Sequence, residues 1–154
     1  MRGDSGVVAD EQQRSDPVSR LLRLPGTTRG FIDRIVAGSV NQSGRTTLHM
    51  LITTWDLAGG GPFAASAMAT TGMAKTVDIV EKSLTVPVFS PIIKRLGADK
   101  VKLRASLCAS ALVGIGIMRY AVRSEPIHSM EVDALVDAVA PTLQRYLTGD
   151  LSRP

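Results

Sequence analysis

One segment near the carboxyl end constrains the fold of this chain more than any other. Residues 105–118 contain no charged side chain, and together with their flanks they predict a single helix over residues 99–122. A soluble helix that is apolar on nearly every side must also be covered on nearly every side. The uncharged run of 14 residues between Arg104 and Arg119 is shorter than the ~20 residues that a bilayer requires, so it indicates a core helix.

The apolar residues of this predicted helix divide into two faces at about 100° per residue. One face consists of Leu103, Leu107, Gly114, Ile117 and Met118. The other is built mainly of small residues, namely Ala105, Ala109, Leu112 and Gly116. Other helices of the chain can cover one face, whereas the second needs a further layer or a second copy of the chain. Because small residues permit close helix approach, we predict that the Ala105 face meets a second copy; the alternative is a central helix within a single bundle.

The last predicted helix, residues 129–149, also carries two stripes. Its large apolar residues form a continuous core face at Val132, Leu135, Val136, Val139, Leu143, Tyr146 and Leu147. Its second stripe repeats small residues at every fourth position. Two such helices from each subunit would form a four-helix bundle across a two-fold axis. The candidate interface residues are Ala105, Ala109, Leu112, Gly116, Tyr120, Ala134, Ala138 and Thr142.

The apolar period of the remaining chain is helical as well. It predicts helices over residues 28–40, 46–56, 62–71 and 74–86, then a bend at Pro87 and Pro91 and a short helix at 92–96. No stretch alternates as a strand would. Residues 1–20 mix both charge signs with small polar residues and predict a disordered leader. Residues 21–151 are then one all-α domain, a bundle of about six to seven helices.

Neither the composition nor the motifs suggest catalytic, cofactor or metal chemistry. The single cysteine, Cys108, excludes an intrachain disulfide, and its apolar surroundings favour a buried thiol over a reactive one. Glu125 and His128 have the spacing of a di-iron motif, but Pro126 indicates a loop there and no second copy exists. No glycine-rich phosphate loop or nucleophile elbow occurs. We therefore predict that the chain is not an enzyme.

The formal net charge is +4, and part of it is concentrated around Gly97. The cations there are Lys94, Arg95, Lys100, Lys102 and Arg104. A cluster of this kind is able to contact nucleic acid through phosphate groups. Asp99 interrupts it, however, and no aromatic side chain is interleaved for base stacking. A solvated face is the favoured interpretation.

Bulky or pliable apolar residues outside the last helix suggest a ligand cavity. Aromatic and methionine side chains often line adaptable pockets, in which one polar group orients the ligand. The candidates are His49 as the polar group and, as the apolar wall, Trp55, Phe63, Met68, Met73, Phe89 and Met118. The alternative is ordinary core packing, for which the same residue types also serve.

Two stretches of the carboxyl-terminal third resemble a known family. RASLCASALVGIGIMRYAVRSEPI (residues 104–127) and VAPTLQRYLTG (residues 139–149) are similar to the C-terminal domain of tetracycline-repressor-family transcription regulators. A weaker resemblance extends through Trp55, Asp56 and residues 96–99 back toward residue 21. The resemblance implies an all-helical domain whose last two helices form a dimer bundle and whose other helices enclose a small-molecule pocket.

In that family, an effector in the pocket changes the spacing of two amino-terminal helix-turn-helix heads and releases DNA. A three-helix head needs about 45 residues at ordinary helix lengths. The segment before the first convincing predicted helix, at Thr28, is shorter than that and poor in core residues. We therefore expect that this chain does not bind DNA by itself.

The leading hypothesis is a cytoplasmic dimerisation and effector-sensing domain of tetracycline-repressor type, with no membrane segment and no cofactor. Its expected partners are a second copy of the chain, full-length relatives as heterodimer partners, and an unidentified small apolar effector. The rival hypothesis is a small helical enzyme or carrier that depends on a polar residue such as His49. A third is non-specific nucleic-acid binding through the cations of residues 94–104.

Overall fold

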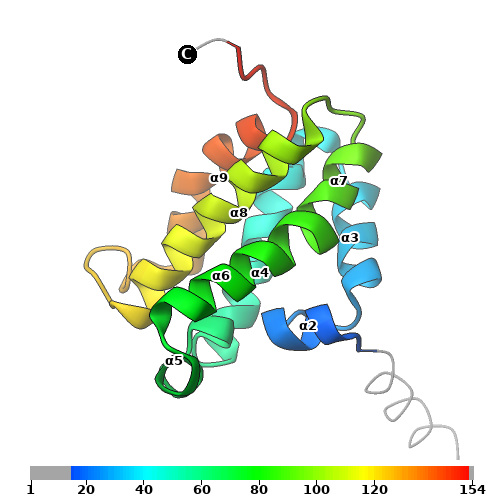
Figure 1. Ribbon diagram of the computed structural model, residues 1–154. Coiled ribbons are helices and arrows are strands. Elements are labelled where there is room, and N and C mark those ends of the chain that lie inside the picture. The colour runs from blue at the N-terminus through cyan, green and yellow to red at the C-terminus, as the bar shows by residue number, and fades with distance from the viewer. Residues whose placement is uncertain (1–14, 153–154) are drawn as a thin grey trace, which may run out of the picture.

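Every regular element that the structure describes is helical. The computed structural model describes residues 15–152, and no strand occurs within this range. The α-helices are α2 (Pro17–Leu22), α3 (Thr28–Ala37), α4 (Ser43–Leu57), α5 (Ala65–Thr71), α6 (Met73–Leu84), α7 (Ser90–Arg95), α8 (Val101–Gly116) and α9 (Val132–Thr148). They pack as one bundle, in which α4 lies along α9 (Figure 1). The predicted all-α class is confirmed.

The amino-terminal boundary of the domain differs from the prediction. Helix α2 begins at Pro17, inside the predicted disordered leader, so the proposed boundary at residue 20 is wrong. The Asp16 carboxylate accepts hydrogen bonds from the backbone N–H of Ser19, at 2.9 Å, and of Thr28, at 2.7 Å. One side chain therefore caps α2 and also holds the first turn of α3. Residues 1–14 of the predicted leader lie outside the described part.

The bend predicted at Pro87 and Pro91 is also wrong. A π-helical segment, η3 (Thr85–Phe89), connects α6 directly to α7, so that residues 73–95 form one uninterrupted rod (Figure 1). A proline inside an α-helix removes one backbone hydrogen bond and crowds the preceding turn. The wider π-turn accommodates both changes without ending the helix.

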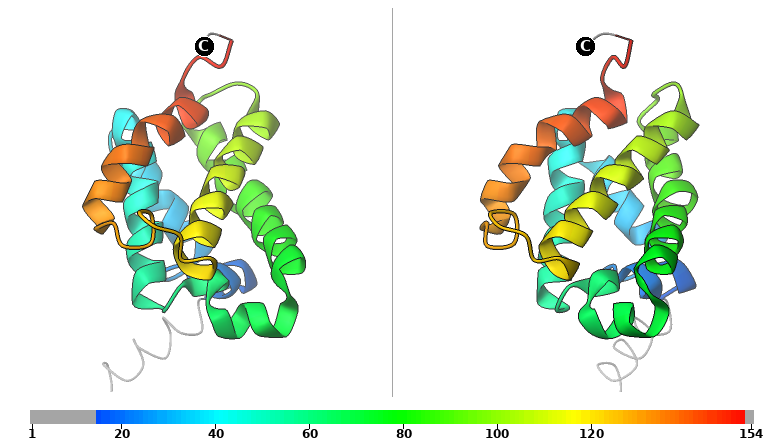
Figure 2. Two further views of the ribbon diagram at one scale, coloured as in Figure 1. Left: turned by 90° about the vertical axis from the view of Figure 1, so that its left-hand side faces the viewer. Right: turned by 60° about the vertical axis from the view of Figure 1, so that its left-hand side comes forward.

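Helix α8 crosses the bundle between this rod and α9. It contacts α6, η3 and α7 on one side and α9 on the other, and a second π-helical segment, η4 (Ile117–Ala121), extends it to residue 121. The two views of Figure 2 show α8 and α9 converging where α8 begins and α9 ends. These two helices thus form one side of the molecule.

A buried arginine fastens this convergence. The side chain of Arg104, in the first turn of α8, is 5% exposed. Its Nη2 donates to Asp99 Oδ1 at 3.0 Å and to the carbonyl of Gly149 at 2.6 Å, and its Nη1 donates to the carbonyl of Tyr146 at 3.1 Å. The guanidinium therefore satisfies carbonyl groups that the end of α9 leaves without helical partners.

Candidate functional site

The two faces of α8 have opposite surroundings. Ala105, Ala109 and Leu112 are fully buried within their own chain. Gly116 is buried as well, and a Cβ added there would lie 2.2 Å from Cε2 of Phe63. We call these four residues the inner face of α8. They contact the core of their own chain and leave no surface for a partner.

The opposite face of α8 remains uncovered. We call it the outer stripe of α8; its members are Leu103, Leu107, Ser110, Gly114 and Met118. Leu103 is 50% exposed, Ser110 and Gly114 are exposed, and the other two are partly exposed. A Cβ added at Gly114 would meet nothing within 4 Å. The stripe therefore presents apolar and small side chains to the outside.

Helix α9 contributes a neighbouring strip of small residues. Ala134, Ala138 and Thr142, at every fourth position of the helix, are all exposed. Helices α8 and α9 pack against each other and share one side of the molecule (Figure 2). We call the outer stripe of α8 and this strip of α9 together the α8–α9 surface.

The predicted interface is therefore corrected on α8 and retained as a prediction on α9. Ala105, Ala109, Leu112 and Gly116 are wrong as interface residues, because their own chain buries them. Tyr120 is also turned inward: its ring lies edge-on to Trp55, with ring centroids 6.3 Å apart. Ala134, Ala138 and Thr142 remain available to a partner.

The apolar character of α8 is only partly explained by the fold. Among the described residues, one helix, Val101–Ala121, has the length and the apolar composition needed to cross a membrane. The most apolar 18-residue stretch of this helix is 39% buried inside the bundle. The central helix of a soluble bundle meets the same criterion. The length and composition of this helix are thus weak evidence for a membrane span.

The three aromatic residues of the predicted pocket are fully buried core residues. Trp55, Phe63 and Phe89 have no exposed surface. The indole Nε1 of Trp55 donates to the carbonyl of Leu22 at 2.7 Å, and the ring packs edge-on against Phe63, with centroids 5.6 Å apart. These rings therefore have the role of ordinary core packing, which is the alternative to a ligand pocket.

The other pocket candidates are spread over the molecule. The side chain of His49 is 51% exposed, and its Nε2 lies 3.6 Å from Asp133 Oδ1 on α9. Met73 is 49% exposed, and Met68 and Met118 are partly exposed. None of the seven candidates lines the cavity beside Thr76, the hollow beside Asp56, the groove beside Lys102 or the hollow beside Gln144. The structure does not bring them together around one of these cavities.

A polar cluster that no sequence motif indicates fastens the other end of α8. The side chain of Arg119 in η4 is 7% exposed. Its Nε lies 3.1 Å from Oδ1 of Asp56 and its Nη2 lies 2.9 Å from Oδ2. Its Nη1 donates to the carbonyls of Ile127 and Met130, each at 2.8 Å. The guanidinium thereby ties α4 to the loop that precedes α9.

Tyr120 and His128 complete this cluster. The Tyr120 hydroxyl donates to Asp56 Oδ1 at 2.6 Å, and His128 Nδ1 lies 2.8 Å from the carbonyl oxygen of Arg119. Burial alone would raise the pKa of Asp56, but hydrogen bonds from Arg119 and Tyr120 and the charge of Arg119 outweigh burial and hold that pKa below its ordinary value. Burial and the bond to Asp56 raise the pKa of Tyr120, which keeps the phenol protonated as a donor. The cluster is a structural clamp.

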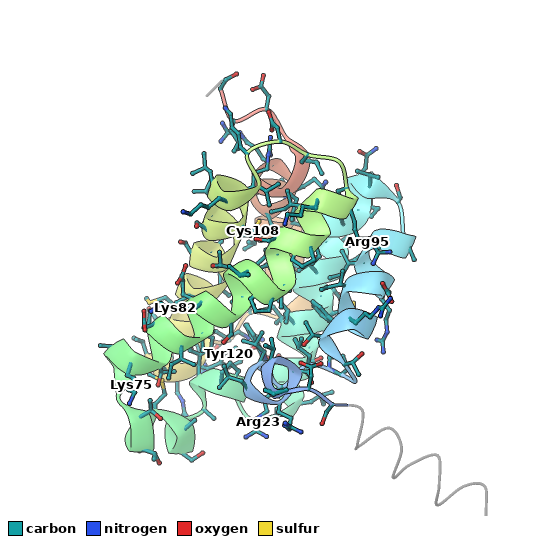
Figure 3. The ribbon with its side chains drawn as sticks, turned by 45° about the vertical axis from the view of Figure 1, so that its right-hand side comes forward. Arg23, Lys75, Lys82, Arg95, Cys108 and Tyr120 are labelled. Carbon is teal, nitrogen blue, oxygen red and sulfur yellow. The ribbon has the colours of Figure 1, made fainter. Side chains whose placement is uncertain are left out.

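The predicted basic cluster is divided by the fold. Arg104 is buried beneath the end of α9, and Arg95 forms an ion pair with Asp33 on α3. Lys94 and Lys102 instead border a groove of about 750 Å³ between α8 and the rod of residues 73–95, together with Lys82, which Figure 3 labels. The cations thus do not form one continuous patch.

Cys108 lies within α8 with its thiol buried. Burial raises the pKa of this thiol to about 12. At neutral pH the thiolate is therefore strongly disfavoured, in agreement with the predicted inert role. Across the described residues, His, Cys, Asp and Glu side chains form no group of three that could hold a metal ion.

The comparison with protein families gives a match that agrees with this architecture. The family model described as the tetracyclin repressor-like, C-terminal domain matches residues 41–147. This match spans more than half of the chain, and the chain belongs to that family. Domains of this family are regulatory modules that sense small molecules and dimerise. No curated protein and no solved structure matched the chain.

Proposed function

We propose that this chain is the dimerisation and effector-sensing domain of a tetracycline-repressor-type transcription regulator, acting in the cytoplasm as a homodimer. The observation that carries the proposal is the outer stripe of α8, which is apolar or small along its length and is left uncovered by the chain's own helices. An exposed apolar strip of this kind is typical of a surface that another protein covers.

The α8–α9 surface supports a two-fold pairing. Gly114 and Ser110 leave room on α8 for a helix of a second copy to approach closely, and Ala138 does the same on α9. In a two-fold contact the same surface serves both subunits, so a self-complementary apolar strip is what such a contact needs. Pairing of α8 and α9 with their copies would give a four-helix bundle. A full-length relative with the same surface would form a heterodimer in the same way.

The rival proposal, a small helical enzyme or carrier, gains no support from His49. The imidazole is half exposed and faces Asp133 on the surface. This arrangement differs from a polar group that orients a ligand inside an apolar cavity. An effect of His49→Ala on any turnover or carrier activity would favour the rival.

We further propose that the described surfaces do not read DNA. Arg95 and Arg104, two cations of the predicted basic cluster, are paired within the chain. A gel shift with duplex DNA at physiological salt should show no sequence-specific complex. A complex that disappears on replacing Lys100 and Lys102 by alanine would contradict this.

The dimer is tested by placing a charge on either half of the α8–α9 surface. The wild-type chain should scatter light as a particle of about twice 16.4 kDa. Ser110→Arg on α8 and Ala138→Arg on α9 should each give a monomer, because an arginine would have to be desolvated in the interface. Ser66→Arg, at an exposed position of α5, is the matched control and should remain dimeric.

The result that overturns the proposal is equally direct. A wild-type chain that stays monomeric at micromolar concentration has no such interface. A dimer that survives both arginine substitutions uses another surface. Circular dichroism of each variant separates a lost interface from a lost fold.

A further inference from the structure

A small cavity lies between α2 and the family-matched part of the chain. Its volume is about 160 Å³, and its lining comes from α2, α5, α6 and the short helix η2 (Gly61–Phe63). The apolar part of its wall consists of Leu21, Pro62, Ala67, Ile79 and Val80. Cavities of about 150 Å³ accept a benzene ring, so this space fits one small ring or a branched aliphatic group.

An unsatisfied hydroxyl marks this cavity. Thr76 lines it and is 6% exposed. Its Oγ1 is the buried side-chain oxygen or nitrogen that lacks a hydrogen-bond partner within the described part of the chain. A buried polar atom normally has a partner, either in the protein or in a bound molecule. The hydroxyl can donate a hydrogen bond to an acceptor on a ligand.

The charges around the cavity have one sign. Arg20 on α2 and Arg23, which caps the end of α2, are both exposed and belong to the lining, and no acidic residue does. Figure 3 labels Arg23 at the end of the molecule where α2 and α5 lie. Two guanidinium groups beside an apolar space favour an anionic group at the mouth of the cavity, since guanidinium pairs well with carboxylate.

We propose that this cavity binds a small amphipathic carboxylate, with its apolar body inside, its acceptor on Thr76 Oγ1 and its charge at Arg20 and Arg23. This inference rests on the proposed sensing function and names the chemical class of effector. Arg20, Leu21 and Arg23 precede residue 41, where the family match begins, so this chain adds a wall that the match does not include.

The cavity is connected to the clamp at the end of α8. Gly61, which lines the cavity, has φ of +54°, and a Cβ there would lie 2.4 Å from Cδ1 of Trp55. The Trp55 indole in turn bonds to the carbonyl of Leu22 on α2 and packs against Tyr120 of the Asp56–Arg119 cluster. A ligand that moves α2 or η2 therefore acts on residues directly beside the ones that fasten α8.

The experiment uses benzoate as the probe and benzamide as its neutral counterpart. Titration calorimetry on the full chain should give binding of benzoate, and much weaker binding of benzamide. Thr76→Val, which keeps the side-chain shape, should weaken benzoate about tenfold. Arg23→Gln should weaken it severalfold, and Ala67→Leu, which fills the cavity, should abolish it.

Matched variants separate the site from general effects. Thr70→Val on α5 and Arg34→Gln on α3, both exposed and outside the lining, should bind benzoate as the wild type does. Thr76→Ser should retain most of the affinity because it keeps the hydroxyl. Circular dichroism verifies that each variant is folded.

The proposal is overturned if the folded wild-type chain does not bind benzoate, if benzamide binds equally well, or if Thr76→Val and Ala67→Leu bind as the wild type does. Light scattering on the same samples keeps the two proposals apart. A monomer that binds benzoate would contradict the dimer and leave this site intact. A dimer without benzoate binding would contradict this site alone.

Discussion

The inner face and the outer stripe of α8 are made of similar residues but have opposite surroundings, since one is buried and the other is exposed or partly exposed. Each contains leucine and glycine at helical spacing, only two residues apart at Gly114 and Gly116. Gly116 is in contact with the ring of Phe63, whereas Gly114 faces open space. Small residues therefore permit close packing without specifying the partner. The neighbours of each face decide whether the chain itself covers it, as at Gly116, or leaves it open, as at Gly114.

The largest difference between the two faces is expected for leucine truncation. Leu112→Ala should lower the free energy of unfolding by about 2–5 kcal/mol, because it leaves a cavity in a filled core. Leu103→Ala, half exposed on the outer stripe, should cost less than about 1 kcal/mol. Urea denaturation in the Ser110→Arg background measures monomer unfolding alone. Equal losses would mean that the two faces are not distinct.

Alanine substitutions at Gly114 and Gly116 should change the free energy of unfolding in opposite directions. Gly116→Ala places a methyl group against Phe63 and should cost about 1–3 kcal/mol. Gly114→Ala meets no neighbour and should gain about 0.5–1 kcal/mol from its better helix propensity. The same urea experiment compares them. A stabilising Gly116→Ala would show that Phe63 does not occupy the space beside it.

The smallest expected effect is the contribution of Asp56 to the loss of stability at low pH. Because the pKa of Asp56 is lowered in the folded chain, its contribution to stability is present above the ordinary value of 3.8 and is lost as the pH falls through the lowered pKa. Unfolding free energies measured from about pH 5 downward should therefore decrease less steeply in Asp56→Asn than in the wild type. The outer stripe has no titratable side chain, so the monomer–dimer equilibrium should not follow the pH dependence of the unfolding free energy. An unchanged slope in Asp56→Asn would contradict the clamp.

The sequence predicts much of this fold because helices depend on local periodicity. The two faces of α8 and the small strip of α9 follow directly from residue spacing. The inner face could not be distinguished from the outer one, because Phe63 lies 53 positions before Gly116 and their contact is set by packing of the whole bundle. The partner of Arg119 is hidden for the same reason, since Asp56 lies far away in the sequence.

One other difference, the start of α2, has a signal in the local sequence, whereas the cavity does not. Asp16 and Ser19 have the spacing of a capping box and precede the apolar residues Leu22 and Leu24, so the start of α2 has a local signal. The cavity beside Thr76 has none, because no periodicity indicates which buried hydroxyl will lack a partner. It depends on how α2 meets α6, which only the folded chain determines.

The bond between Trp55 and the carbonyl of Leu22 has a practical consequence. Trp55 is the only tryptophan of the chain, so its intrinsic fluorescence reports on a single place. If α2 detaches, the indole loses its acceptor and meets water, and its emission should shift to longer wavelength. A recombinant fragment that starts at residue 41, where the family match begins, lacks Leu22. Its Trp55 fluorescence should therefore already lie at the longer wavelength.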